Sequence, residues 1–591
     1  MAVSSAAGAS PGVLRGRWHG PSPLARWEPD RHRWVVAVVL ALVCGVFCFY
    51  GLWVGELYRT EALRAIIGRE MLRSGDWLVP RLYGEPLLTK PPGMYAAIAL
   101  ASWPWGEVTE TTARLPSAVA AAALVLLVYW TFRRCLERRS GLIAAAIAPC
   151  SWLWLDKGIA AEIDMLQVFW VGASLLFLLR AVEAEEEAPR TGSVPPAWLW
   201  WVLALVCVAG GLLTKWTAPA FFYAAAVPLL AWRRRLHLLW SWRHLLAAAL
   251  AAGLCLAWAA WVVHQVGWDV FYATVRNEAL PRLSHRHHLG SAWEQVAETL
   301  LHPGKILLAH LPWSVFALAT FRPGFGQHWD EHGRRLLQAL HCWAWPNLLL
   351  WTLLPDHATR HSFPLFPGIS GLAALAWAAH LDARGSDRGA AWFAGSAALA
   401  LALFALGAPI AAVAGLALLP SDAWGLVLVL AVLALGVAAW GLRGFWNRQP
   451  AVVLVSIILT WVVVKLAFVH CYVPLRNHGR QPREKAAVLA EHVPPHQTLY
   501  VFLLKDEGIM FYYGRPVVRL RGWNELPRDA GQVWCILQQQ EYEALPQHRQ
   551  WTLRHSVALR DEQGDPIVLV GLERTAAGSG PPPREAQRSG R

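Results

Sequence analysis

The sequence predicts an α-helical polytopic membrane protein, and its composition, apolar blocks and tryptophan content support this prediction. Of the 591 residues, 56% are hydrophobic and 16% are charged, and the mean hydropathy is +0.34. A soluble protein usually carries about a quarter charged residues. The apolar residues gather in blocks of about 17–22 residues, each long enough to cross a hydrocarbon core of about 30 Å. The 36 Trp agree with this class, because indole rings favour the membrane–water interface.

The apolar blocks predict about thirteen transmembrane helices. Counts of twelve or fourteen remain alternatives, because the ranges 140–156, 197–213, 216–232 and 391–418 are the least distinct. The predicted spans are 34–54, 113–132, 140–156, 164–182, 197–213, 216–232, 245–264, 305–321, 336–354, 363–381, 391–418, 424–442 and 450–470.

The formal charge of +13 follows from membrane topology rather than from a nucleic-acid partner. Basic residues lie in short loops beside the spans, where positive charge marks the cytoplasmic side. A cytoplasmic N-terminus places nearly every basic group inside and the C-terminal segment outside. The acidic run Glu183–Glu187 is the one dissenting loop, but acidic residues contribute little to this rule.

Cysteine usage and the N-terminus exclude other classes. Nine Cys occur, mostly within apolar spans, and no CxxC pair is present, so neither a disulfide framework nor a zinc ribbon is expected. The first 33 residues are polar and basic and precede a span longer than the apolar core of a signal peptide, so we expect no cleavable signal.

The predicted organisation has four parts. A cytoplasmic basic tail (1–33) precedes a transmembrane domain (34–475), which is followed by an extracytoplasmic α/β domain (476–575) and a disordered tail (576–591). Two outside loops are long, 55–112 and 265–304. The α/β prediction rests on alternating helix and strand patterns: a helix at Glu484–Val493 and strands at Leu499–Leu504, Val517–Leu520, Val533–Leu537 and Pro566–Val570.

The first outside loop opens with a segment, 56–73, that predicts an interfacial helix. Its apolar residues recur at helical spacing with charges between them, which is typical of a helix lying in the membrane plane. Thr60 is a candidate helix cap and Glu61 suits the first turn. Glu61 is therefore either a carboxylate that stabilises the helix terminus or a catalytic carboxylate.

The same loop then presents a lysine before two prolines. Gly75–Pro80 predicts a turn into an extended run, and Pro91 and Pro92 suit the start of a following helix. Lys90 would then lie at a helix N-terminus, where an anion is favoured. Arg59, Arg64, Arg81 and Arg114 are close in sequence, so an anionic headgroup or phosphate is the expected partner; a snorkelling lysine is the alternative.

These motifs resemble the first loop of the bacterial aminoarabinose (lipid A) transferase and protein O-mannosyltransferase superfamily. The matching elements are Glu61–Met71, Gly75–Pro80 and Leu88–Tyr95, in the same order and spacing. Weaker similarity continues through 161–165, 211–216, the His-rich segment near 285, and 360–367. The resemblance implies a GT-C fold and an enzyme that uses polyprenyl-phosphate sugars.

The sequence departs from the family at two positions in this loop. The family commonly has an Asp-Glu pair where this chain has Thr60-Glu61, and an acidic residue where it has Thr89. The catalytic carboxylate would then be Glu61, or else Glu56, Glu162 or Asp164. A catalytically degenerate relative that only binds sugar-lipid is a further alternative.

Other candidate groups lie in later loops. Glu162 and Asp164 stand near the membrane, where carboxylates are costly unless solvated, paired or metal-bound. His285 and His287 could share one side of an extended segment and bind a divalent metal, although no fixed carboxylate partner is apparent. The candidate substrate-binding residues are Arg59, Arg64, Lys90, Tyr95, Arg114, Lys215, Arg282, Arg360 and His361.

The expected reaction is transfer of a hexosyl or pentosyl group from a polyprenyl-phosphate carrier to an acceptor hydroxyl on the outer face of a bacterial inner membrane. Glu61 would be the base, helped by Asp164, and Lys90 with Arg59 and Arg282 would hold the phosphate. Family resemblance implies inversion. The acceptor is a lipid, a protein or a glycan. A transporter or flippase of lipid-linked sugars is the rival class, but no internal repeat is visible and such proteins rarely need a 58-residue outside loop.

Overall fold

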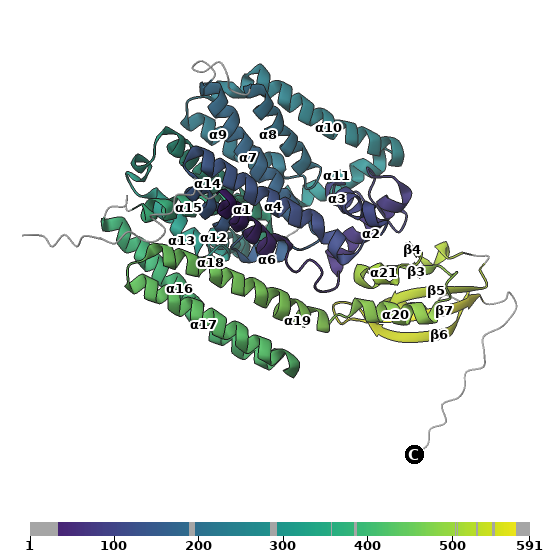
Figure 1. The fold of residues 1–591 in the computed structure, drawn as a ribbon. Coiled ribbons are helices and arrows are strands. Elements are labelled where there is room, and N and C mark those ends of the chain that lie inside the picture. Colours follow the sequence, from purple (N-terminus) through teal and green to yellow (C-terminus); the bar gives the residue numbers. More distant parts are fainter. Residues whose placement is uncertain are drawn as a thin grey trace, which may run out of the picture.

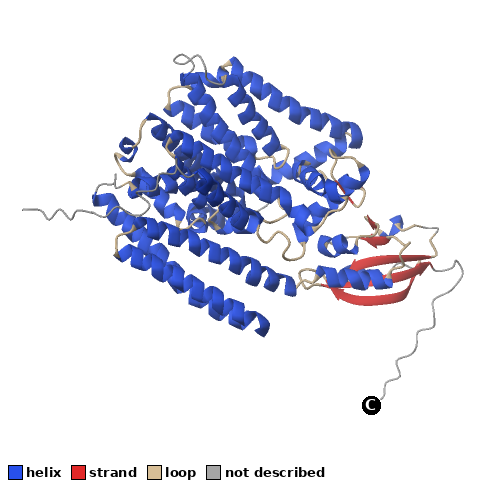
Figure 2. Cartoon of the chain, in the orientation of Figure 1, coloured by secondary structure: helices blue, strands red, loops and turns tan. Residues whose placement is uncertain are grey.

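The computed structural model is a helical bundle with a small sheet-containing unit at one end (Figure 1). Helices dominate, and strands are concentrated near the C-terminus (Figure 2). The structure describes residues 33–187, 196–283, 292–355, 357–382, 387–502, 504, 506–527, 530–545 and 550–574. The predicted N-terminal tail up to residue 32 and the predicted tail 576–591 lie outside these ranges.

Each of the predicted spans contains a helix. Seven helices in the described ranges are long and apolar enough to cross a membrane, or eight if one bent pair is a single span. The bundle helices are α1 (Arg33–Cys44), α4 (Glu110–Cys135), α5 (Arg138–Ile147), α6 (Trp152–Lys157), α7 (Ile163–Glu187), α8 (Ala197–Leu212), α9 (Ala218–Trp232), α10 (Trp242–Val266), α12 (Ala292–Ala309), α13 (Trp313–Leu318), α14 (Glu331–Leu353), α15 (Phe366–Leu381), α16 (Asp387–Leu418), α17 (Trp424–Trp446) and α18 (Pro450–Ala467).

Two predicted spans are not single straight helices. The range 140–156 divides into α5 and the short α6, and the range near 305–321 is a pair, α12 and α13, bent by 105°. Pro312 stands at this second break, and proline interrupts the hydrogen bonds of a helix interior. The fold class is therefore as predicted, but the structure does not establish the count of thirteen full spans.

The bundle buries its helices unequally. The most apolar window of the span ending in α15 is buried entirely inside the protein, whereas the corresponding windows of α16 and α17 are only 17% and 22% buried. Exposed apolar helix faces of this kind suit lipid, where apolar surface is not penalised.

The acidic run that dissents from the charge rule, Glu183–Glu187, is neutralised at one end of the bundle. It forms the last turns of α7. Its carboxylates pair with Arg134, Arg180, Arg233, Arg243 and Arg335. The run therefore lies among basic residues that the charge pattern assigns to one side of the membrane.

The two long loops are largely helical. The first contains α2 (Arg59–Ser74), the short pair β1 (Arg81–Leu82) and β2 (Glu85–Pro86), and α3 (Gly93–Ser102). The second contains α11 (Trp268–Leu283) and the first part of α12. Apolar residues of α2, including Ala65, Ile67 and Met71, are buried in one cluster with residues of the sheet-containing unit. The apolar face of α2 is therefore covered by protein rather than exposed.

The C-terminal unit, residues 482–574, is an α/β structure joined to α18 through α19 (Val473–His478). It contains α20 (Pro482–His492), β3 (Leu499–Val501), α21 (Glu507–Tyr513), β4 (Val517–Arg519), β5 (Gln532–Gln538), α22 (Gln539–Ala544), β6 (Trp551–Arg560) and β7 (Pro566–Arg574). The sheet order is β4-β3-β5-β7-β6, parallel among the first three strands and antiparallel in the rest. The helix and four strands predicted here are present. Strand β6 was not predicted, because this edge strand is mostly exposed and its apolar residues are interrupted by the polar run Arg554–Ser556.

Candidate active site in the first loop

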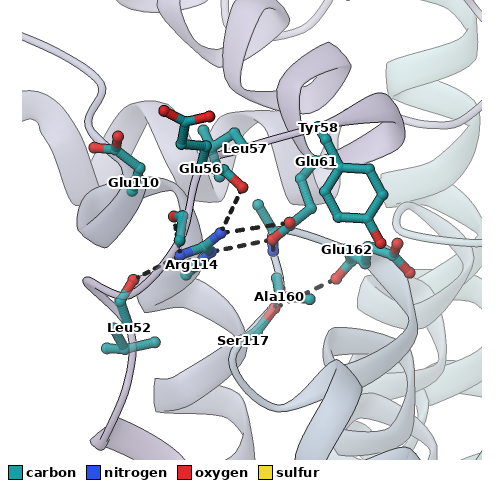
Figure 3. Close-up of polar contacts among 12 residues, drawn as sticks. Leu52, Glu56, Leu57, Tyr58, Glu61, Glu110, Arg114, Ser117, Ala160 and Glu162 are labelled. Atoms are coloured by element: carbon teal, nitrogen blue, oxygen red, sulfur yellow. Dashed lines mark hydrogen bonds and ion pairs between the residues drawn. The ribbon is translucent and has the colours of Figure 1, made fainter. Parts of the chain in front are cut away.

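A buried ion pair between Glu61 and Arg114 fixes α2 to α4. The Arg114 Nε lies 3.1 Å from Glu61 Oε1, and the side chains are 2% and 5% exposed. The remaining guanidinium nitrogens donate to the carbonyls of Leu52, Val54, Gly55 and Glu56 (Figure 3). Arg114 therefore links the segment after the first predicted span to α2.

This geometry does not fit Glu61 as a catalytic base or Arg114 as a phosphate ligand. Burial alone would raise the pKa of Glu61, but the Arg114 charge and its hydrogen bonds hold that pKa below its usual value. A base needs to reach an acceptor hydroxyl, and this carboxylate is enclosed. The guanidinium N–H groups of Arg114 all donate to protein oxygens, which leaves none for a substrate.

Glu61 instead positions the segment that carries Glu162. Its Oε1 accepts a hydrogen bond of 2.9 Å from the Ala161 N–H. Ser117, one turn beyond Arg114 on α4, donates to the Ala160 carbonyl at 2.6 Å. The backbone on the N-terminal side of Glu162 is thus held by two buried side chains (Figure 3).

Glu162 lies beside Thr60 at the start of α2. The Thr60 hydroxyl donates to Glu162 Oε1 at 3.1 Å. Lys157 Nζ is 2.9 Å from both Glu162 Oε2 and Asp156 Oδ2. The side chains of Lys157 and Glu162 are each 14% exposed, so this group is partly accessible. The structure brings a carboxylate and an ammonium to the start of α2.

A second ion pair lies deeper in the same region. Lys215 Nζ is 2.8 Å from Asp164 Oδ1, and both side chains are nearly buried. Lys157 and Arg64 are also close enough to interact electrostatically with Asp164. Arg64 donates to the Thr60 carbonyl at 2.8 Å, and its buried Nε has no hydrogen-bond partner among the described residues. Three cations (Arg64, Lys157 and Lys215) and three carboxylates (Asp156, Glu162 and Asp164) therefore meet where α2, α6 and α7 converge with the turn between α8 and α9.

The turn that carries Lys90 docks on the turn that carries Lys215. The Gly93 N–H donates to the Leu213 carbonyl at 2.8 Å, and Pro92 is the residue that immediately precedes α3. Lys90, three residues earlier, is partly buried and donates to the Thr89 carbonyl. Residues 90 and 215, far apart in sequence, therefore belong to neighbouring turns.

Gly93→Ala is expected to destabilise the protein by about 1–3 kcal/mol. A Cβ at this position would lie 2.7 Å from Thr214 Oγ1 and 2.8 Å from the Leu213 carbonyl oxygen, and a backbone atom cannot easily move away. Thermal unfolding in detergent measures the loss. Gly253→Ala is the matched control, because a Cβ there meets open space within α10; an equal loss in both variants would contradict the close-contact explanation.

The remaining candidates are less closely grouped. Arg59 and Arg360 are exposed, His361 is partly exposed, and Tyr95 is 1% exposed within the core between α2 and α3. Glu56 pairs with Arg483 at 3.7 Å, and Figure 3 shows its carboxylate well apart from Glu162. His285, His287 and the Arg282 side chain lie outside the described residues.

Sequence reasoning missed Lys157 and Asp156. Asp156 is the last residue of the predicted span 140–156 and Lys157 follows it, and neither belongs to a recognisable motif. The available signal was a pair of opposite charges at a predicted membrane boundary, where unpaired charge is costly. Within the described ranges, no three or more His, Cys, Asp or Glu residues gather where they could hold a metal ion. His285 and His287 lie outside these ranges, so the metal site that would include them stays a prediction.

Comparisons with known proteins agree with this architecture. Residues 89–261 match the family profile of the dolichyl-phosphate-mannose-protein mannosyltransferases. The undecaprenyl phosphate-α-4-amino-4-deoxy-L-arabinose arabinosyl transferase of Erwinia tasmaniensis is 24% identical over 57% of this chain and 58% of its own length. A second such transferase, from Sodalis glossinidius, is 33% identical over 32% of this chain and 33% of its own length. The chain thus spans less than two thirds of these relatives.

Structural similarity extends further along the chain. The crystal structure of ArnT from Cupriavidus metallidurans bound to undecaprenyl phosphate is 19% identical, covers 93% of this chain and 99% of that one, and superposes with a TM-score of 0.66. The apo structure gives a TM-score of 0.62 over 94% of this chain. The chain is therefore a polytopic membrane protein with the GT-C-type fold of ArnT, and it resembles the aminoarabinose transferases in sequence.

Proposed function

We propose that this protein is a membrane glycosyltransferase that moves a sugar from a polyprenyl-phosphate carrier to an acceptor hydroxyl. The site would face the outer side of a bacterial inner membrane, with the N-terminus in the cytoplasm and the C-terminal unit outside. The names of its relatives, which include undecaprenyl-phosphate aminoarabinose transferases, and the ArnT-type fold support this class.

The observation that carries the proposal is the charge cluster at the start of α2. Sugar transfer from a phosphate carrier needs a base for the incoming hydroxyl and cations for the departing phosphate. The partly exposed Glu162 and Lys157 lie together. Arg64 and Lys215 lie near Asp164, which Lys157 also approaches, and the turn that follows Lys90 contacts the turn that precedes Lys215. Both kinds of group are therefore available within one region.

Each residue has a distinct proposed role. Glu162 accepts the proton of the acceptor hydroxyl, and Lys157 holds its carboxylate in place. Lys90 and Arg64 bind the carrier phosphate, with Lys215 held in place by Asp164. Arg59, Arg282, Arg360 and His361 are further candidates for the substrate. A direct displacement would invert the anomeric carbon, and the isoprenoid tail would stay in lipid throughout.

The test is sugar transfer by the full-length protein in membranes supplied with a radiolabelled polyprenyl-phosphate sugar. An enzyme should move label to an acceptor fraction and release polyprenyl phosphate. A flippase would move the lipid across the membrane with its glycosidic bond intact, and a degenerate relative would bind the carrier without turnover. Either outcome would overturn the proposal.

Lys90→Ala is expected to weaken donor binding roughly 10- to 150-fold, because a hydrogen bond to a charged partner is worth about 1.5–3 kcal/mol. The measurement is the donor KM in the transfer assay. Arg81→Ala is the control, since Arg81 is a nearby loop cation within 3.8 Å of Asp76. An unchanged KM in the Lys90 variant would remove this residue from the phosphate site.

A further inference from the structure

Helix α2 begins without a capping side chain of its own. The preceding residue, Tyr58, makes no side-chain capping bond. Thr60, which the sequence favours as the cap, lies inside the first turn and donates to Glu162 instead. Arg59 enters the helix with φ of +46°, a conformation that residues other than glycine adopt at a cost. Something outside α2 must therefore stabilise its first turn.

Glu562 supplies the missing acceptor from the far end of the chain. It lies in the turn between β6 and β7, and its Oε2 and Oε1 are 2.9 and 3.3 Å from the Arg59 backbone nitrogen. Its own backbone N–H donates to Asp506 Oδ2 at 2.9 Å. A Cβ at Gly508 would overlap the Glu562 carboxylate. The carboxylate thus occupies a closely fitted position, 6% exposed.

Two further contacts fix the C-terminal unit against the same loop. The Leu57 N–H donates to the Tyr512 hydroxyl at 2.8 Å, and that hydroxyl donates to Glu110 at 2.9 Å. Arg69, farther along α2, donates to the Phe511 carbonyl at 3.0 Å from both terminal nitrogens. Leu57, just before α2, and Arg69, within α2, are therefore both attached to α21.

We propose that the C-terminal unit is part of the sugar-transfer site: Glu562 caps α2 and so holds Thr60 against Glu162. Glu562 is a positioning residue, since it acts through the backbone of Arg59 and touches no reacting group. The catalytic consequence rests on the proposed function, whereas the capping role does not.

The proposal has a pH dependence that the neighbouring charges define. Glu562 faces Asp506, which caps α21, Glu507 of α21 and the backbone N–H of Arg59. Asp561 of the same turn acts on Asp506, and Lys485 of α20 donates to the Asp561 carbonyl. Burial first, and then the Asp506 carboxylate, raise the pKa of Glu562 to about 8. A raised carboxyl pKa favours the docked state in acid, and this advantage is lost as the pH rises from the ordinary Glu range to about 8.

The test is hydrogen exchange of the α2 first-turn amides in the full-length protein, comparing wild type with Glu562→Ala, Glu562→Gln and the control Glu573→Gln, an exposed residue near the end of β7. Glu562→Ala should lower protection roughly 2- to 30-fold, as the loss of a helix cap does. Glu562→Gln keeps an acceptor oxygen but cannot ionise. It should therefore retain protection, and the wild-type fall in protection towards pH 8, corrected for intrinsic exchange, should disappear.

Unchanged protection in Glu562→Ala would overturn the capping role, and so would a wild type with the same pH response as Glu562→Gln. If the alanine variant unfolds the sheet, seen as loss of protection in β5 and β7, the glutamine comparison alone decides. In the transfer assay, Glu562→Ala should lower kcat about tenfold, and Glu562→Gln should retain the wild-type kcat. If Glu562→Ala loses protection but keeps full kcat, the proposed effect of the cap on catalysis is wrong. A wild type without transfer activity would overturn the proposed function while leaving the exchange result valid.

Discussion

Arg114→Ala is expected to destabilise the protein by about 3–5 kcal/mol, because removing one partner of a buried ion pair leaves an uncompensated charge. Glu61 would remain 4% exposed without its cation, and four carbonyls of the Leu52–Glu56 segment would lose their donor. The expected readout is a large fall in the thermal unfolding temperature in detergent and in the yield of folded protein.

Two comparisons separate this explanation from a general effect of arginine loss. Arg554→Ala removes a cation that is 60% exposed and paired with Glu573, and surface pairs of this kind contribute about 0–1 kcal/mol. The double variant Arg114→Met with Glu61→Leu should be less destabilised than Arg114→Ala alone, since neither charge is then left unpaired. A double variant no more stable than Arg114→Ala would contradict the buried-charge explanation.

The fold could be predicted because its signal is local. Apolar blocks predict membrane helices wherever backbone groups must be satisfied within one segment, and each predicted range does contain a helix. The breaks were harder to predict. The 105° bend between α12 and α13 depends on how the two halves pack, and apolar composition alone does not reveal it.

The site was only partly predictable because its pairings are not local. The sequence identified Glu61 and Arg114 as separate candidates, but their contact joins residues 53 positions apart and gives both a structural role. Glu162 and Asp164 were expected to be solvated, paired or metal-bound, but the sequence did not indicate that each would pair with its own lysine, Lys157 and Lys215. Helix capping by Glu562 across 503 residues has no sequence signal at all.

The altered pair Thr60-Glu61 has a physical explanation in this arrangement. Glu61 needs to be acidic because it binds Arg114 and the Ala161 N–H together. Position 60 can be a threonine because the carboxylate beside it is supplied by Glu162 at 3.1 Å. A carboxylate at position 60 would stand next to Glu162 and repel it, so the hydroxyl is the compatible partner.

Glu162→Gln is expected to lower kcat for sugar transfer by about 10²- to 10⁴-fold, the usual contribution of a general base. The amide preserves the hydrogen bond to Thr60 but cannot accept a proton, so donor KM and thermal stability should change little. Asp156→Asn is the matched control, because Asp156 binds the other side of Lys157 and contacts Glu162 only through it. Full activity in Glu162→Gln would exclude this residue as the base.

A second substitution, at Thr60, tests more directly whether Glu162 is the base. In the double variant Thr60→Asp with Glu162→Gln, the new carboxylate would arise within hydrogen-bonding reach of the lost one, since the two native side chains are 3.1 Å apart. Part of the lost kcat should return, whereas Thr60→Asp alone should impair the enzyme by setting two carboxylates side by side. Recovery in the double variant would show that the reaction needs a carboxylate at this place in space, whichever residue supplies it. No recovery, with stability intact, would show that Glu162 acts through Lys157 rather than as the base.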